Sequence, residues 1–189
     1  MRARYSVMSM VLHWGMALVI FGAWLAGQLI EDAPRGAERI FVTGIHALLG
    51  LSVLALLLPR LVARFAGGVP EDLDMPTWLR RAGLAGHLAL YALMVALPLL
   101  GLAILMSGRA PFVVLGLFSV PNWMADQGLR KTFEEVHALH ADGLLVVVGL
   151  HVAATLWHLF IRRDGVAARM IPGAVISPAL TPGSPSSPR

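Results

Sequence analysis

The sequence predicts an all-α integral membrane protein, a four-helix bundle with both termini in the cytoplasm. Of its 189 residues, 57% are hydrophobic and only 14% are charged, whereas soluble domains carry roughly a quarter charged residues. The mean hydropathy is +0.73. Four apolar segments come close to or exceed the about 20 residues with which a helix crosses a bilayer. None alternates with a period of two, so a β-barrel is disfavoured.

The predicted spans follow one another with loops between them. They are Val7–Gln28, Ile40–Leu58, Leu84–Met106 and Val136–Ile161. The first span is longer than the core of a signal peptide, roughly 7–15 residues, so we interpret it as a retained helix rather than a cleaved signal. The spans make one domain, residues 1–172. The Pro/Ser-rich tail, 173–189, is predicted to be disordered.

Two loops carry further predictions. The inner loop from Pro59 to Gly83 contains Pro70-Glu71-Asp72, which suits a turn or surface segment. The outer loop from Ser107 to Glu135 contains an apolar run, 112–118, that is too short to span. We expect this run to cap the outer side of the bundle, with Trp123 as an interfacial anchor.

The basic residues set the orientation. With the N-terminus inside, ten basic residues are cytoplasmic and five face outward, as the positive-inside rule requires. The outward five are Arg35, Arg39, Arg109, Arg130 and Lys131. The net charge of +4 is therefore attributed to topology, and nucleic-acid binding is not expected. The chain has no cysteine, which excludes disulfides and covalent haem attachment through C-x-x-C-H.

Six of the seven histidines lie inside the apolar runs, where an ionisable ring is costly and therefore a functional candidate. A helical rise of about 1.5 Å per residue places the rings in two layers. The outer layer holds His46, His137 and His140. The inner layer holds His13, His87, His151 and His158.

The spacing on the fourth span suits two stacked haems. His137 and His151 are fourteen residues apart, about four turns and about 21 Å, on nearly one face. Each could ligate one iron, with His46 opposite in the outer layer and His13 opposite in the inner layer. His140 is eleven residues from His151 and also near that face, so the spacing leaves the outer ligand open. Bis-histidine iron has no open position, which suits electron transfer.

Two metal-site alternatives are disfavoured. His137 and His140 at i,i+3, without nearby carboxylate or thiolate ligands, are weak evidence for zinc. A histidine relay in a metal transporter would require carboxylates within the spans, and Asp142 is the single one there.

Short motifs also occur in a familiar order. They are Arg4-Tyr5-Ser6, Leu12-His13-Trp14, Gly44-Ile45-His46-Ala47, Pro59-Arg60-Leu61, Gly86-His87-Leu88, Leu97-Pro98-Leu99-Leu100-Gly101, Val136-His137, Gly149-Leu150-His151 and His158. Together they resemble the bacterial cytochrome b561 family over about residues 4 to 172. These are short four-helix dihaem cytochromes, so the resemblance implies two non-covalent haem b groups in a multi-pass protein of the bacterial inner membrane.

The resemblance also implies roles for individual residues. By position, His46 with His137 would ligate the outer haem iron and His13 with His151 the inner one. His140 matches no family histidine. His158, about two turns beyond His151, is expected in the vicinity of a quinone, with an interface histidine as the alternative. His87 is expected to be a packing or haem-contact residue.

The activity that the resemblance implies is electron transfer, in its sharpest form from periplasmic superoxide to ubiquinone. The alternative is a cytochrome b subunit that accepts electrons from a partner dehydrogenase or hydrogenase. Arg109, Arg130 and Lys131 would attract an anionic donor, or else be ordinary solvated charges. Arg60 and Arg64 would pair with haem propionates or with lipid phosphates.

Overall fold

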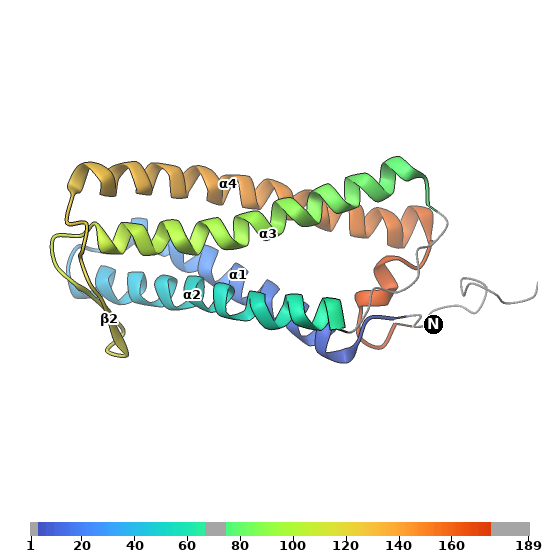
Figure 1. The fold of residues 1–189 in the computed structure, drawn as a ribbon, viewed down its shortest axis with the longest axis horizontal. Helices are drawn as coiled ribbons and strands as arrows, with labels where there is room; N and C mark the ends of the chain where they lie inside the picture. The colour runs from blue at the N-terminus through green and yellow to red at the C-terminus, as the bar shows by residue number, and fades with distance from the viewer. Residues whose placement is uncertain (1–3, 67–74, 175–189) are drawn as a thin grey trace, which may run out of the picture.

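The computed structural model describes residues 4–66 and 75–174 and contains the four predicted helices (Figure 1). They are α1 (Val7–Asp32), α2 (Ala37–Ala66), α3 (Thr77–Met106) and α4 (Gln127–Trp157). A π-helical turn, η1 (His158–Arg162), continues α4, and a 3-10 turn, η2 (Ala167–Met170), follows. By length and composition, each of the four long helices can cross a membrane. The predicted membrane bundle is confirmed.

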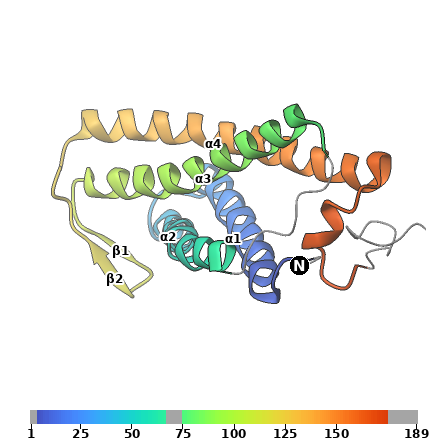
Figure 2. The same cartoon turned by 45° about the vertical axis from the view of Figure 1, so that its right-hand side comes forward.

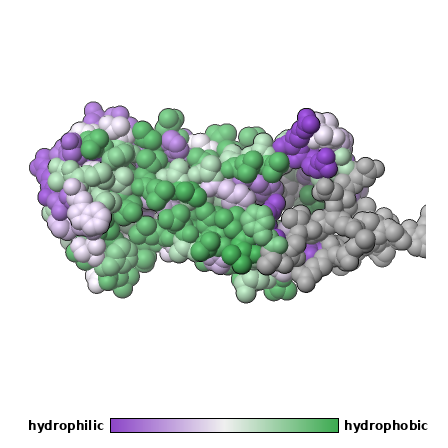
Figure 3. Space-filling model, in the orientation of Figure 1, coloured by the Kyte–Doolittle hydropathy of each residue, from purple (hydrophilic) through white to green (hydrophobic). Residues whose placement is uncertain are grey.

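The surface of the bundle is suited to lipid. On the face drawn in Figure 3, apolar residues cover the middle of the molecule, and hydrophilic residues gather toward both ends. Large apolar side chains on this surface are well exposed, among them Leu18 at 72% and Leu150 at 65%. Exposed apolar area on this scale indicates a hydrocarbon environment rather than water.

The bundle consists of two helical hairpins. Backbone contacts concentrate between α1 and α2 and between α3 and α4, and α4 makes few with α1 or α2. Figures 1 and 2 show the two hairpins as separate layers, with the start of α1 and the end of α4 at the same end of the bundle. Any group that bridges α4 to α1 or α2 therefore lies between the hairpins.

Two small apolar clusters hold the hairpins together. Toward the inner end, Met16 and Val53 pack with Leu57 and Met94, so α1, α2 and α3 all contribute. At the outer end, Leu105 packs with Val114 and Val120.

The inner ends of two helices differ from the sequence prediction. α2 does not stop at Leu58 but continues through Pro59 to Ala66, and α3 begins at Thr77 rather than Leu84. A proline inside a membrane helix is tolerated where neighbouring groups satisfy the backbone. The extension carries Arg60 and Arg64 on a helix instead of in a loop. The predicted surface turn at 70–72 and the tail from residue 175 lie outside the described residues.

The outer loop forms a β-hairpin that the sequence did not predict. Strands β1 (Phe112–Val114) and β2 (Phe118–Val120) pair antiparallel, with Val114 opposite Phe118. Val114 is fully buried against the outer cluster, so the loop does cap the outer side, as expected. Trp123 is 80% exposed, in keeping with an interfacial anchor.

Gly44 of α2 explains how closely the hairpin packs. Leu115, at the turn between the strands, has a positive φ of 49°. A Cβ added at Gly44 would lie 2.8 Å from Cδ2 of Leu115, a distance that real contacts avoid. The glycine therefore lets the turn dock on α2 two residues before His46.

Candidate functional site

The outer histidine layer contains one close ring pair between the hairpins. The ring centroids of His46 on α2 and His137 on α4 are 5.9 Å apart, with an interplanar angle of 72°. Nδ1 of His46 lies 2.8 Å from the Ala23 carbonyl oxygen of α1. When Nδ1 donates that bond, the Nε2 lone pair is available to a metal, the usual arrangement of a ligating histidine. Nδ1 of His137 is enclosed and has no hydrogen-bond partner among the described residues.

His140, the other candidate for the outer layer, is arranged differently. Its Nδ1 donates to the Val136 carbonyl oxygen of its own helix at 2.8 Å. The close imidazole neighbour of His46 is the ring of His137. The geometry therefore favours His137 over His140 for an outer pair.

Two glycines leave room for the outer rings, a feature that sequence reasoning missed. A Cβ added at Gly27 would lie 3.2 Å from Cε1 of His46, and one at Gly101 would lie 3.6 Å from Cε1 of His137. Gly101 stood in a motif, but its contact could not be assigned without the packing of the helices. Each imidazole is thus pressed against the backbone of a neighbouring helix, which restricts its orientation.

Gly27→Ala is expected to disturb the outer pair. The added methyl group would require His46 to move by a few tenths of an ångström, although its Nδ1 is held by Ala23. We expect weaker retention of any cofactor bound between the outer rings, measured as haem content after detergent washing. Gly149→Ala is the matched control, because Gly149 is exposed and nothing lies within 4 Å of an added Cβ. Equal haem retention in the two variants would contradict the expectation.

The inner layer brings three rings together rather than two. The ring centroids of His13 on α1 and His151 on α4 are 6.2 Å apart. Those of His87 on α3 and His151 are 5.7 Å apart, a contact that sequence reasoning did not predict. Nδ1 of His87 donates to the Gly83 carbonyl oxygen at 2.7 Å. His151 therefore has two imidazole neighbours, from opposite hairpins.

Arg60 determines the hydrogen-bonding state of His13. Nη2 of Arg60 is 2.9 Å from Nδ1 of His13. A guanidinium can only donate, so Nδ1 accepts and the hydrogen of the neutral ring resides on Nε2. His13 can ligate a metal through Nε2 only after Arg60 releases Nδ1 and the ring changes tautomer.

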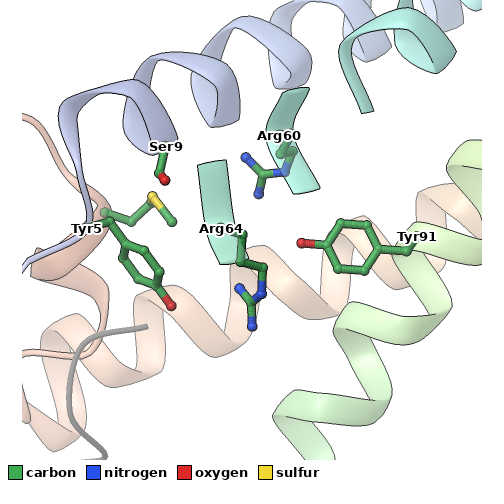
Figure 4. A pocket seen from close by; sticks show the side chains of 6 residues that line it. Tyr5, Ser9, Arg60, Arg64 and Tyr91 are labelled. Atoms are coloured by element: carbon green, nitrogen blue, oxygen red, sulfur yellow. The ribbon is translucent and has the colours of Figure 1, made fainter. Parts of the chain in front are cut away.

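A polar pocket lies beside His13 at the inner end (Figure 4). Its lining residues are Tyr5, Ser9, Arg60, Arg64, Tyr91 and Met170. The hydroxyl of Tyr91 points toward the arginines and is enclosed without a hydrogen-bond partner among the described residues. Two guanidiniums and an unsatisfied hydroxyl supply donors of the kind that bind a carboxylate or phosphate. The free volume is only about 10 Å³, so these side chains must move apart to admit such a group.

His158 lies apart from these rings, in the π-helical turn that ends α4. Its Nδ1 is 2.7 Å from Oδ2 of Asp164. The two side chains are 11% and 15% exposed. Sequence reasoning singled out His158 but not its carboxylate partner, since the six-residue interval matches no helical contact.

A second pocket, of about 250 Å³, opens at the outer end. Arg39, Arg109 and Arg130 all line it. Thr43 of α2 also lines it, one turn before His46. Lys131 does not belong to the lining and lies 3.8 Å from Glu135 instead. Of the three basic residues that were expected to attract an anionic donor, Arg109 and Arg130 therefore line one pocket. Arg39 lines it as well.

Paired imidazoles inside a membrane-spanning helical bundle are the arrangement expected of a b-type cytochrome. A family model described as prokaryotic cytochrome b561 matches residues 4–173. The chain belongs to this family, whose members are electron-transfer proteins that bind haem b. It is a multi-pass protein of the bacterial inner membrane, as the four apolar helices require.

Characterised relatives are similar over nearly their whole lengths. A Yersinia pestis protein named probable superoxide oxidase CybB is 30% identical over 174 residues, covering 91% of this chain and 98% of the relative. Cytochrome b561 homolog 2 of Escherichia coli is 31% identical, covering 89% and 91%. Cytochrome b562 of Cereibacter sphaeroides is 29% identical, covering 88% and 94%.

The histidine pairs fit a bis-histidine haem. A metal–imidazole bond is about 2.0–2.1 Å long, so two rings on opposite sides of one metal have centroids about 6 Å apart. The His46–His137 and His13–His151 centroids, at 5.9 and 6.2 Å, meet this requirement. Direct edge-to-face packing of rings gives similar distances. What favours the haem is the position of both pairs between hairpins whose backbones make few contacts there.

Proposed function

We propose that this protein transfers electrons across the inner membrane from periplasmic superoxide to ubiquinone, with two haem b groups as carriers. The observation that carries the proposal is the outer pocket, where three guanidiniums surround a site one helical turn from the outer histidine pair. The named activity of the Yersinia pestis relative supports the choice of superoxide. The experiment that tests it is the reduction of ubiquinone by the purified protein when superoxide is supplied and no partner protein is present.

The outer pocket provides the entry for an anionic donor. Its volume is about 250 Å³, against about 30 Å³ for one water molecule in the liquid, so a small hydrated anion fits. Arg130 is partly neutralised by Glu134 at 2.9 Å, and Arg39 caps the end of α1 by donating to the Ala33 carbonyl oxygen. The exposed Arg109 contributes positive charge at the pocket mouth.

Four histidines hold the haem irons in this proposal. His46 and His137 would ligate the outer iron, and His13 and His151 the inner one, so α4 would supply a ligand to each. Each haem supplies a one-electron carrier whose potential is set by its ligands and hydrogen bonds. At the inner site, Arg60 leaves Nδ1 of His13. Arg60 and Arg64 would then be free to hold the propionates, because both face the pocket next to the Arg60–His13 contact rather than the surrounding lipid.

Ubiquinone is reduced at the inner end, in the vicinity of His158. The imidazole of His158 lies at the end of the last span, close to where a quinone headgroup resides in the bilayer interface. Through its small exposed area, His158 could therefore contact a quinone beyond the rings of His13, His87 and His151, which would hold the inner haem.

The purified protein in ubiquinone-containing vesicles is expected to reduce the quinone when superoxide is supplied, without any partner protein. Arg109→Gln should slow the superoxide-driven reduction several-fold at low ionic strength, and the deficit should shrink in high salt because screening acts beyond about 8–10 Å. Quinol formation and haem reduction are followed by absorbance.

Lys131→Gln removes the same charge from a residue outside the pocket lining and is the matched control. Haem that accepts electrons from a chemical reductant but not from superoxide would exclude superoxide as donor. A requirement for a soluble dehydrogenase or hydrogenase would instead favour the role of a cytochrome b subunit.

A further inference from the structure

The turn that follows α4 brings a carboxylate back onto His158. η1 is π-helical, and it ends where Arg163 adopts a left-handed conformation, φ 53°. The backbone N–H of Arg163 donates to the His158 carbonyl oxygen at 2.8 Å. π-helical turns occur frequently at functional sites. This one places Asp164 beside a histidine six positions earlier.

Both carboxylate oxygens of Asp164 are engaged. Oδ2 accepts from Nδ1 of His158 at 2.7 Å and lies 3.2 Å from Nε of Arg162. Oδ1 accepts from the backbone N–H of Val166 at 3.2 Å. Arg162 is itself held over the ring of Trp157 at 5.4 Å. The carboxylate therefore has a fixed position, and the pair it forms with His158 is mostly buried, while each side chain keeps a small exposed area.

This arrangement fixes which nitrogen of His158 exchanges protons. With Nδ1–H donated to Asp164, the second nitrogen, Nε2, either offers its lone pair or carries a transferable proton. A buried carboxylate that orients an imidazole in this way is a recurrent device in general acid–base catalysis. Quinone reduction requires such a group, since each quinone takes up protons together with electrons.

We infer that Asp164 is a positioning residue that orients His158 to deliver a proton to the quinone. The inference rests on the proposed function. Two superoxide ions each lose one electron and leave as O₂, and the quinone gains two electrons and two protons. One proton passes from Nε2 of His158 to a quinone carbonyl oxygen, which becomes a hydroxyl. Cytoplasmic water supplies the other proton and restores the one on Nε2.

The test separates proton delivery from electron transfer. Haem in the full-length protein is first reduced chemically and then reoxidised either by a soluble ubiquinone analogue or by ferricyanide, which takes an electron and no proton. Asp164→Asn is expected to slow reoxidation by the quinone about tenfold or more and to leave reoxidation by ferricyanide unchanged. Haem content and the reduced spectrum should equal those of the wild type.

Arg162→Gln is the control for a purely structural role of the turn, because it removes a contact to Asp164 without touching His158. It should be reoxidised by quinone at the wild-type rate. If Asp164→Asn loses haem, His158→Gln makes the same test while Asp164 keeps Arg162 and Val166. Unchanged quinone kinetics, or an equal loss with ferricyanide, would overturn the role of Asp164. Failure of the wild type to reduce quinone would overturn the proposed function as well.

Discussion

Replacing either His46 or His137 with alanine is expected to lower the haem content from the proposed two haems per chain to one. The two rings face each other at 5.9 Å from opposite hairpins, so each variant leaves the outer iron with one protein ligand and an apolar cavity on the other side. The inner rings are unchanged, since the fourteen residues between His137 and His151 correspond to about 21 Å of helix. Haem is quantified by pyridine extraction against protein concentration.

His140→Ala is the matched control for this prediction. It removes an imidazole from the same helix, one turn from His137. Nδ1 of His140 donates to the Val136 carbonyl oxygen of its own helix, so this ring is already engaged there. This variant should keep both haems and an unaltered reduced spectrum. Full haem content in a variant of His46 or His137 would contradict the assignment of the outer ligands. A loss of haem in His140→Ala would instead identify His140 as an outer ligand.

The spans and histidine layers could be predicted from sequence because both depend only on position along the chain. Apolar run length determines which segments cross the bilayer, and the rise per residue determines the depth of each ring. The ends of α2 and α3 were missed because proline and charge suggested a loop, whereas the helix continues past Pro59. Composition alone could not locate these two helix ends, which the structure places at Ala66 and Thr77.

The rotation of each helix about its own axis, and the packing of the helices on one another, could not be predicted in the same way. Depth placed His87 in the inner layer, but its 5.7 Å contact with His151 depends on how α3 is rotated against α4. Gly27 lies on a different helix from the ring it accommodates. The pairing of His158 with Asp164 depends on a π-helical turn, and no simple sequence period predicts such a turn.

The strands of the outer hairpin were missed for a different reason. Each has three residues, too few for an alternating pattern to be distinguished from an apolar loop. Their position follows from the contact between Leu115 and Gly44. The hairpin in turn covers the outer cluster, and Phe112 lines the pocket proposed for the donor.

His151→Ala is expected to abolish quinone reduction while leaving the outer haem reducible. His151 is the common neighbour of both other inner rings, so no arrangement of the remaining histidines restores two facing imidazoles from α4 and α1. With the inner carrier gone, electrons stop about 21 Å from the inner layer. The measurements are haem content, superoxide-driven haem reduction and quinol formation on one preparation. Quinol formation at the wild-type rate would contradict the inner ligand assignment.

Parallel substitutions of His13 and His87 decide which ring faces His151 across the iron. Nδ1–H of His87 is already donated to Gly83, whereas His13 must first be released by Arg60. The position in the motifs favours His13, whereas the ring separations from His151, 6.2 Å for His13 and 5.7 Å for His87, both lie near the spacing of two rings on one iron. His13→Ala should therefore lose the inner haem, and His87→Ala should keep it with a shifted reduction potential. The reverse result would make His87 the ligand and leave His13 as the partner of Arg60.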